Sequence, residues 1–153
     1  MSAPATRSIG LILFCGCLIA AISFGPRSAV GLFLTPMTEA RGWSRETFSL
    51  AVALQNLLWG AGQPFAGMLA DRFGTGRVLL GGAVLYASAL ALTAWTESAA
   101  VLQVTFGVLF GLGLAAASFS IVLAAFGRSV SPGRRTMAFG IGTAAGSLGQ
   151  FLF

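Results

Sequence analysis

A single charged side chain inside an apolar run is the strongest candidate for chemistry in this sequence. Arg27 follows Gly25-Pro26, and a proline within a helix removes one hydrogen bond and favours a kink. A charge inside a membrane-spanning helix costs about 2.5–3.5 kcal/mol, so it is expected to face a cavity or a partner. A guanidinium binds a carboxylate through two parallel hydrogen bonds, which predicts that Arg27 binds an anionic substrate. Alternatively, its long stem carries the charge to the membrane surface near Leu34.

Two adjacent amide side chains form the next candidate group. Gln55 and Asn56 lie early in a second apolar run, and Gln63-Pro64 follow in the same run. Side-chain amides in hydrocarbon need hydrogen-bond partners, so they either line an aqueous path or bond a neighbouring helix. Gln55 and Asn56 are therefore candidate substrate-binding residues, with helix packing as the alternative. Pro64 is expected to bend its helix.

A polar stretch between two long apolar runs is predicted to form a turn outside the membrane. Its notable residues are Gly67, Asp71, Arg72, Gly74, Gly76 and Arg77. The charges of Asp71, Arg72 and Arg77 are too costly in hydrocarbon, so the flanking runs are expected to form a hairpin that enters the bilayer from one face. Gly74 and Gly76 would allow a tight turn with positive φ.

The composition is that of an integral membrane protein. Of the 153 residues, 56% are hydrophobic and 8% are charged, whereas a soluble domain carries roughly 25% charged residues. The net charge of +5 comes from scattered arginines with apolar neighbours, so no nucleic-acid partner is expected. The sequence has no His, and Cys15 and Cys17 lie within an apolar run as packing residues. We expect no catalytic residues, no metal site and no cofactor.

Charge-free stretches predict an all-α membrane protein, a bundle of about five transmembrane helices. Because a spanning helix needs about 20 apolar residues, the predicted spans are approximately 9–34, 46–69, 78–96, 99–127 and 135–153. The fifth stretch is minimal in length. Ser44 is the expected N-cap of the second helix, with Glu46 in its first turn.

The arginines predict the orientation. With a cytoplasmic N-terminus, the inner segments carry Arg7, Arg72, Arg77, Arg128, Arg134 and Arg135. The outer segments carry only Arg41 and Arg45. Positive loops stay cytoplasmic, which favours this multi-pass orientation. A cleaved signal peptide around Arg7 is the competing interpretation, but the apolar character continues well beyond any cleavage site.

Small residues recur in two of the predicted spans. The segment from Gly16 to Phe24 matches the segment from Gly111 to Phe119 at a constant offset, and the two spans cross in opposite directions. Inverted-topology repeats require this relation. The spacings Gly107-x-x-x-Gly111 and Gly142-x-x-x-Gly146 are typical of closely packed helices.

Three motifs together resemble the N-terminal part of a major facilitator superfamily transporter. Gly67-x-x-x-Asp71-Arg72-x-Gly74-x-x-Arg77 resembles the loop signature between its second and third spans. Pro26-Arg27-Ser28 with Gly31-Leu-Phe33 looks like a first-span motif of the monocarboxylate transporter and oxalate/formate antiporter branch. The segment from Arg135 to Gly146 is similar to that branch's fifth-span motif, with Ala145 in place of a Gly. Gly107 stands where drug antiporters have an Arg.

The resemblance implies a function for the whole chain. Residues 1–153 would be a partial N-terminal transmembrane domain, with the C-terminal half of the carrier as its missing partner. The carrier would sit in the cell's inner membrane and move small organic anions such as monocarboxylates by alternating access, with protons as the expected coupling ion. Arg27 would handle substrate or protons. Asp71 and Arg72 would belong to an inner gate, in which we expect Asp71 to pair with Arg128.

Two other classes of protein are alternatives to a transporter. The chain could be a small helical membrane protein that self-associates through its glycine-rich faces, as a pore or assembly factor. A membrane enzyme is the least favoured class, because the acidic residues are expected at membrane edges and no nucleophile–base pair is visible.

Overall fold

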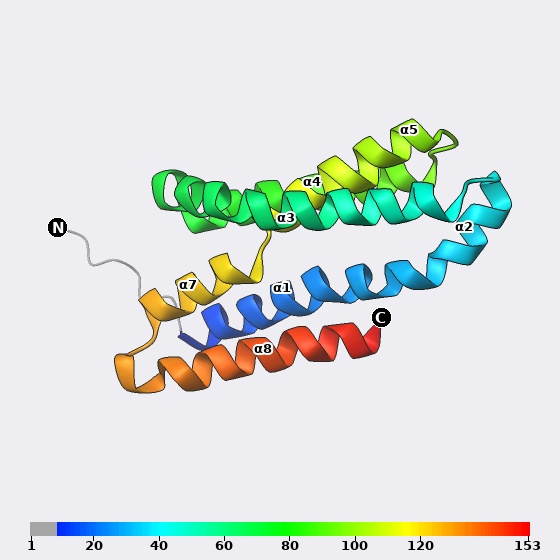
Figure 1. The fold of residues 1–153 in the computed structure, drawn as a ribbon. Helices are drawn as coiled ribbons and strands as arrows, with labels where there is room; N and C mark the ends of the chain where they lie inside the picture. The colour runs from blue at the N-terminus through cyan, green and yellow to red at the C-terminus, as the bar shows by residue number, and fades with distance from the viewer. Residues whose placement is uncertain (1–8) are drawn as a thin grey trace. The chain divides into compact units, whose positions relative to one another are not determined.

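Helices account for every regular element in the described part of the chain (Figure 1). The computed structural model describes residues 9–153, so the predicted inner charge Arg7 lies outside the described residues. The elements are α1 (Ile9–Ala29), the 3₁₀-helix η1 (Val30–Phe33), α2 (Leu34–Arg41), α3 (Arg45–Phe73), α4 (Thr75–Ala94), α5 (Ala99–Leu102), the π-helix η2 (Gln103–Leu109), α6 (Phe110–Ala116), α7 (Phe119–Ser129), the 3₁₀-turn η3 (Pro132–Arg134) and α8 (Arg135–Leu152). The all-α prediction is confirmed.

Three helical runs of the described residues are long and apolar enough to cross a membrane: Ile9–Arg41, Thr75–Ala94 and Ala99–Ser129. They overlap the predicted first, third and fourth spans. Helices α3 and α8 occupy the second and fifth predicted segments, and that these two also cross the membrane stays a prediction. The first run continues through η1 and α2 to Arg41, well past the expected end at Leu34.

The chain divides into two compact units, each described by itself. The central unit comprises residues 29–121, and the terminal unit comprises the described residues 9–28 together with residues 122–153. The central unit therefore holds η1, α2, α3, α4, α5, η2 and α6. The terminal unit holds most of α1, the greater part of α7, and α8.

Glycines of α6 let three helices of the central unit pack backbone against backbone. A Cβ on Gly111 would stand 3.1 Å from the Gln55 Cα of α3. A Cβ on Gly113 would stand 2.7 Å from the Tyr86 nitrogen of α4. Small residues allow such close approach between helices in a membrane, where burial of apolar surface gives no driving force.

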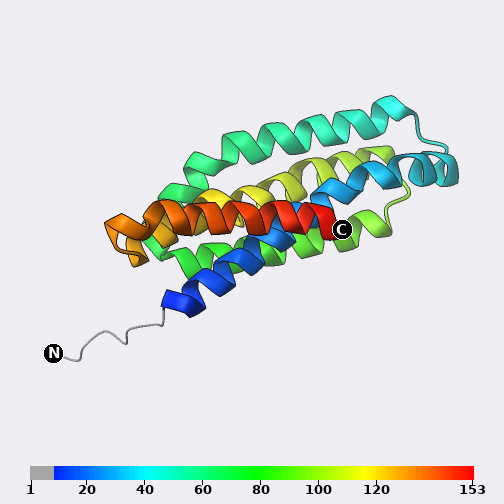
Figure 2. The same ribbon diagram turned by 90° about the horizontal axis from the view of Figure 1, so that it is seen from below.

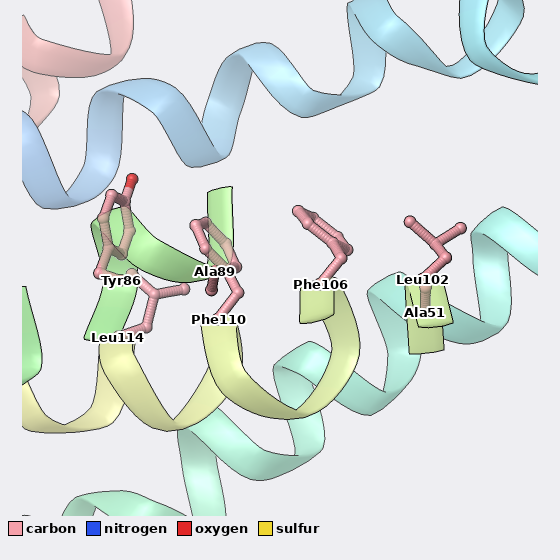
Figure 3. Packing of buried hydrophobic residues seen from close by; sticks show 7 residues of the cluster. All are labelled: Ala51, Tyr86, Ala89, Leu102, Phe106, Phe110 and Leu114. Atoms are coloured by element: carbon pink, nitrogen blue, oxygen red, sulfur yellow. The ribbon is translucent and has the colours of Figure 1, made fainter. Parts of the chain in front are cut away.

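The main core of the central unit forms around the fourth span (Figure 3). Its buried members are Ala51, Tyr86, Ala89, Leu102, Phe106, Phe110 and Leu114. The rings of Phe106 and Phe110 stack with centroids 4.9 Å apart, and the Phe110 and Tyr86 centroids are 4.6 Å apart. Residues 102, 106, 110 and 114 repeat every four positions, so they form one stripe of the helix despite its π-helical segment.

Helices α1, α7 and α8 pack through glycines in the terminal unit. Gly16 faces the ring of Phe126, and a Cβ on it would stand 2.9 Å from Val122 Cγ1. Gly149 of α8 lies against the backbone of Ala21. The chain reaches α8 through the short η3 turn, and Figure 2 follows α8 from there to the C-terminus. The glycine spacing in α8 thus serves contacts within this unit.

The fourth apolar run is broken, which the sequence did not predict. Helix α6 ends at Ala116, Ala117 and Ser118 are not helical, and α7 begins at Phe119. The last α-helical bond runs from the Ala117 nitrogen to the Gly113 carbonyl at 2.8 Å. The break also divides the second copy of the proposed repeat, whereas the segment from Gly16 to Phe24 lies in one continuous helix.

Candidate functional site

Arg27 lies in the last turn of α1, directly after the internal Pro26, and it is half-buried. Its neighbour Ser28 donates a hydrogen bond from Oγ to the Phe24 carbonyl at 3.1 Å. Since the helical run ends at Arg41, Arg27 stands 41 − 27 = 14 residues before its end, roughly four turns. The helix therefore continues about two turns further than the sequence predicted, and both interpretations of Arg27, substrate binding and a side chain that reaches the membrane surface, remain predictions.

The two adjacent amides have different environments. Gln55 is 2% exposed, and in the described part of the structure its Nε2 has no hydrogen-bond partner. Asn56 is half-buried and donates from Nδ2 to the Val52 carbonyl of its own helix at 2.9 Å. The amide of Gln55 is therefore the one left available for another group.

The polar stretch between the second and third apolar runs forms a turn of one residue. Gly74 alone separates α3 from α4 and has a φ of +93°. Its nitrogen donates to the Ala70 carbonyl at 3.0 Å, which ends α3. The prediction of positive φ is correct for Gly74 and wrong for Gly76, which lies in the first turn of α4. A second flexible residue is not needed because helix α4 begins immediately after Gly74.

The predicted gate residues flank this turn on two helices. Gly67, Asp71 and Arg72 lie in the last two turns of α3, and Arg77 lies in the first turn of α4. Asp71, Arg72 and Arg77 are exposed, as a surface position requires. The Arg72 guanidinium lies 5.4 Å from the centre of the neighbouring Phe73 ring. The structure thus brings Gly67, Asp71, Arg72, Gly74 and Arg77 together at one hairpin.

Arg128 lies in the last turn of α7 and is exposed. It belongs to the terminal unit, and Asp71 belongs to the central unit. The pairing of Asp71 with Arg128 therefore remains a prediction. The cation is well placed on its own helix, because a positive charge near a helix C-terminus interacts favourably with the helix dipole.

A polar bridge at the break of the fourth run was missed by sequence reasoning. The Oγ atoms of Ser118 and Ser120 are 2.8 Å apart, and Ser120 Oγ donates to Gln63 Oε1 of α3 at 3.0 Å. Ser118 is 3% exposed. Gln63 is a polar residue in an apolar run, but its partners become its neighbours only through helix packing.

Hydrogen bonds also join the helices at the opposite end of the central unit. Arg41 donates from an Nη atom to the Ala94 carbonyl, the last residue of α4, at 2.8 Å. Gln103 Nε2 donates to the Thr47 carbonyl in the first turn of α3 at 2.8 Å. Both bonds satisfy backbone carbonyls with donors from distant segments. The first bond joins α2 to α4, and the second joins η2 to α3.

Tyr86 is a second buried polar residue that the sequence did not single out. It is 8% exposed, and within the described residues its hydroxyl has no hydrogen-bond partner. The available signal was composition, since Tyr86 is the only tyrosine and stands in a charge-free run. A hydroxyl within an apolar run normally finds a partner when it is buried.

One comparison with known proteins finds a match. The family model described as Major Facilitator Superfamily matches residues 16–153. This range contains 153 − 16 + 1 = 138 residues and includes every candidate residue described above. No curated protein matches the chain.

Proposed function

The chain belongs to the Major Facilitator Superfamily, and we propose that it forms the N-terminal part of a secondary transporter that carries small organic anions across the inner membrane. Members of this family are transporters rather than enzymes. The apolar helical runs agree with a membrane protein. The family match gives the superfamily, whereas the substrate class, the coupling ion and the branch of the family are proposed.

The position of Arg27 is the main support for the proposed substrate class. The residue lies inside the apolar helical run Ile9–Arg41, and its neighbour Pro26 interrupts the helical hydrogen bonds. Placing a cation within an apolar span is costly, so a position of this kind favours a function for the charge. A carboxylate accepts the paired N–H groups of a guanidinium, which makes small monocarboxylates the preferred substrate class.

Gln55 and Asn56 are proposed as neutral substrate-binding residues. This role is better supported for Gln55 than for Asn56, because the Nε2 of Gln55 is buried and has no partner among the described residues. The Asn56 amide already bonds the Val52 carbonyl. We therefore expect Gln55 to contribute more to binding than Asn56.

The turn at Gly74 is proposed as part of an inner gate. It gathers Gly67, Asp71, Arg72 and Arg77 on two helix ends that are joined by one residue. Such a short connection makes the ends of α3 and α4 move together. In alternating access the charges at this turn would pair with other inner residues in one state, Asp71 with Arg128, and separate in the other.

The proposed orientation places this turn and the N-terminus in the cytoplasm. The inner arginines outnumber the outer ones by six to two in the sequence, and the membrane orientation follows this asymmetry. Substrate in carriers with inverted repeats lies near the bilayer midplane between repeats. We therefore propose a C-terminal half of the carrier as the partner of this chain. Protons are the proposed coupling ion.

The alternative, a small self-associating membrane protein, is less favoured by the packing. Its association would use the glycine-rich faces of the fourth and fifth spans. Gly107 and Gly111 instead contact α3, and Gly146 and Gly149 contact α1. These glycines are already covered within the chain.

The test is transport by the protein expressed from its complete reading frame. Proteoliposomes would be loaded with buffer at fixed pH and assayed with labelled lactate, pyruvate, formate and oxalate, with and without an imposed proton gradient. We expect saturable uptake of at least one anion and stimulation by the gradient. Uptake of none of them would contradict the proposed substrate class, and uptake indifferent to the gradient would contradict proton coupling.

A further inference from the structure

Four buried side-chain atoms of the central unit lack a hydrogen-bond partner among the described residues: the Tyr86 hydroxyl, Gln55 Nε2, one Nη of Arg41 and Gln103 Oε1. Arg41 and Gln103 each bond a backbone carbonyl through another atom of the same side chain. Tyr86 is 8% exposed and Gln55 is 2% exposed, and the Tyr86 hydroxyl and Gln55 Nε2 find no hydrogen-bond partner in the part of the chain that the structure describes. Both belong to residues 29–121, so their positions are described within one unit. Buried polar groups without a partner are rare in native proteins, and each one requires an explanation.

Gln55 and Tyr86 both lie against the same stretch of α6. Gln55 of α3 lies against Gly111, and Tyr86 of α4 lies against Gly113 with its ring beside that of Phe110. In Figure 3 the Tyr86 hydroxyl points away from the α6 ribbon. The backbone contacts at the two glycines hold the backbones of Gln55 and Tyr86 against α6.

Two other buried hydroxyls of the same unit have hydrogen-bond partners. Thr93 Oγ1 donates to the Ala89 carbonyl at 2.8 Å and lies 3.1 Å from Thr105 Oγ1. Thr105 Oγ1 in turn bonds the Val101 carbonyl at 2.9 Å. These two hydroxyls bond carbonyls of their own helical runs, whereas within the described residues the Tyr86 hydroxyl bonds none.

We propose that the Tyr86 hydroxyl and the Gln55 amide are hydrogen-bond donors to the carboxylate of the transported anion, with Tyr86 as a binding residue in addition to those already named. This inference rests on the proposed function. A phenol and an amide N–H can both donate, and an ionised carboxylate only accepts. Phe110 and Leu114 supply apolar surroundings, in which a bond from a neutral donor to a charged acceptor is strong. In small-molecule sites a small number of polar groups in an apolar lining fix the orientation of the ligand.

The stability of the unliganded protein distinguishes this role from ordinary packing. Tyr86→Phe removes one oxygen and keeps the ring against Phe110, so it relieves the cost of an unpaired buried hydroxyl. We expect its melting temperature in detergent to equal or exceed that of the wild type. Thr93→Val is the matched control, because it removes a hydroxyl that has partners, and we expect a lower melting temperature with unchanged anion binding.

Binding is measured on the purified protein from the complete reading frame, with labelled lactate, pyruvate, formate and oxalate as probes. For an anion that the wild type binds, Tyr86→Phe and Gln55→Leu are each expected to raise Kd by at least about tenfold, the value of one bond to a charged group. The second variant keeps the test valid if the first does not fold.

The outcomes separate this inference from the function on which it rests. If the wild type binds a carboxylate and both variants bind it equally well, the inference is wrong and the proposed function stands. If the wild type binds none of the four anions, the proposed function fails and the inference fails with it.

Discussion

Gly82 of α4 lies directly against the backbone at Ala117, the residue at which the fourth apolar run breaks. A Cβ on Gly82 would stand 2.5 Å from the Ala117 nitrogen and 2.6 Å from the Ala116 carbonyl carbon. The Ala116 Cβ would stand 2.8 Å from the added Cβ as well. The broken segment therefore rests on a position that only a glycine can occupy without a shift of the backbone.

The neighbouring glycines of α4 provide a matched test of this contact. Gly82→Ala should destabilise the protein by about 1–3 kcal/mol, because the added methyl group overlaps with backbone that cannot rotate away. Gly81→Ala should be neutral or stabilising by about 0.5–1 kcal/mol, since no described atom lies within 4 Å of its Cβ position. Thermal unfolding in detergent measures both. Equal melting temperatures for the two variants would contradict the assigned contact.

The start of α3 depends on one side-chain cap. Ser44 Oγ accepts a hydrogen bond from the Thr47 nitrogen at 3.2 Å, as the sequence predicted. Ser44→Ala should lower the free energy of unfolding by about 1 kcal/mol, and Ser44→Asp should recover most of the loss because aspartate also caps. Amide hydrogen exchange at Thr47 should accelerate in the alanine variant. Unchanged exchange there would show that the cap does not hold this helix end.

Arg41 stabilises the end of α4 from another helix. Its guanidinium donates to the Ala94 carbonyl and lies 5.4 Å from the centre of a Trp43 ring. Arg41→Met should cost roughly 1 kcal/mol, the value of a hydrogen bond with a modest cation–π contribution. Arg45→Met, at the first turn of α3, should cost nothing, because a cation there opposes the helix dipole. A comparable loss of melting temperature in both variants would refute the specific role of Arg41.

Arg27 is expected to be essential for transport and dispensable for folding. Arg27→Ala should abolish anion uptake in proteoliposomes, and Arg27→Lys should retain only a fraction because the paired geometry is lost. Arg45→Ala, an exposed arginine of α3, serves as the control with wild-type uptake. Membrane insertion should be equal in all of them. Normal uptake by Arg27→Ala would mean that this side chain merely reaches the membrane surface.

The predicted gate pair can be tested by exchanging charges. Asp71→Arg and Arg128→Asp should each reduce uptake, because each places two like charges at the inner gate. The double variant should restore uptake to within a few-fold of the wild type. Failure of the double variant to restore uptake would contradict the pairing of Asp71 with Arg128.

Local features could be predicted from the sequence because their causes are local. Ser44 caps α3, and Gly74 adopts positive φ between two helices, as their residue types indicate. Arg27 stays a predicted site residue, proposed because a single charge in an apolar run is costly. The extension of the first run to Arg41 was missed, since polar residues such as Glu39 indicate an outer loop but do not prevent a helix.

The sequence by itself determined the helical membrane class, the hairpin at Gly74 and the candidate role of Arg27, because hydropathy, charge and backbone freedom depend on residue type and spacing. Only the tertiary structure decided which glycines are contacts: Gly140 and Gly81 are open, whereas Gly111 and Gly113 meet the backbones of other helices. It also decided that the hydroxyl of Tyr86 is left unpaired within the described chain while that of Thr93 finds a partner. The physical reason is that a contact depends on which face of one helix meets which face of another, and residue spacing along one chain segment does not contain that information.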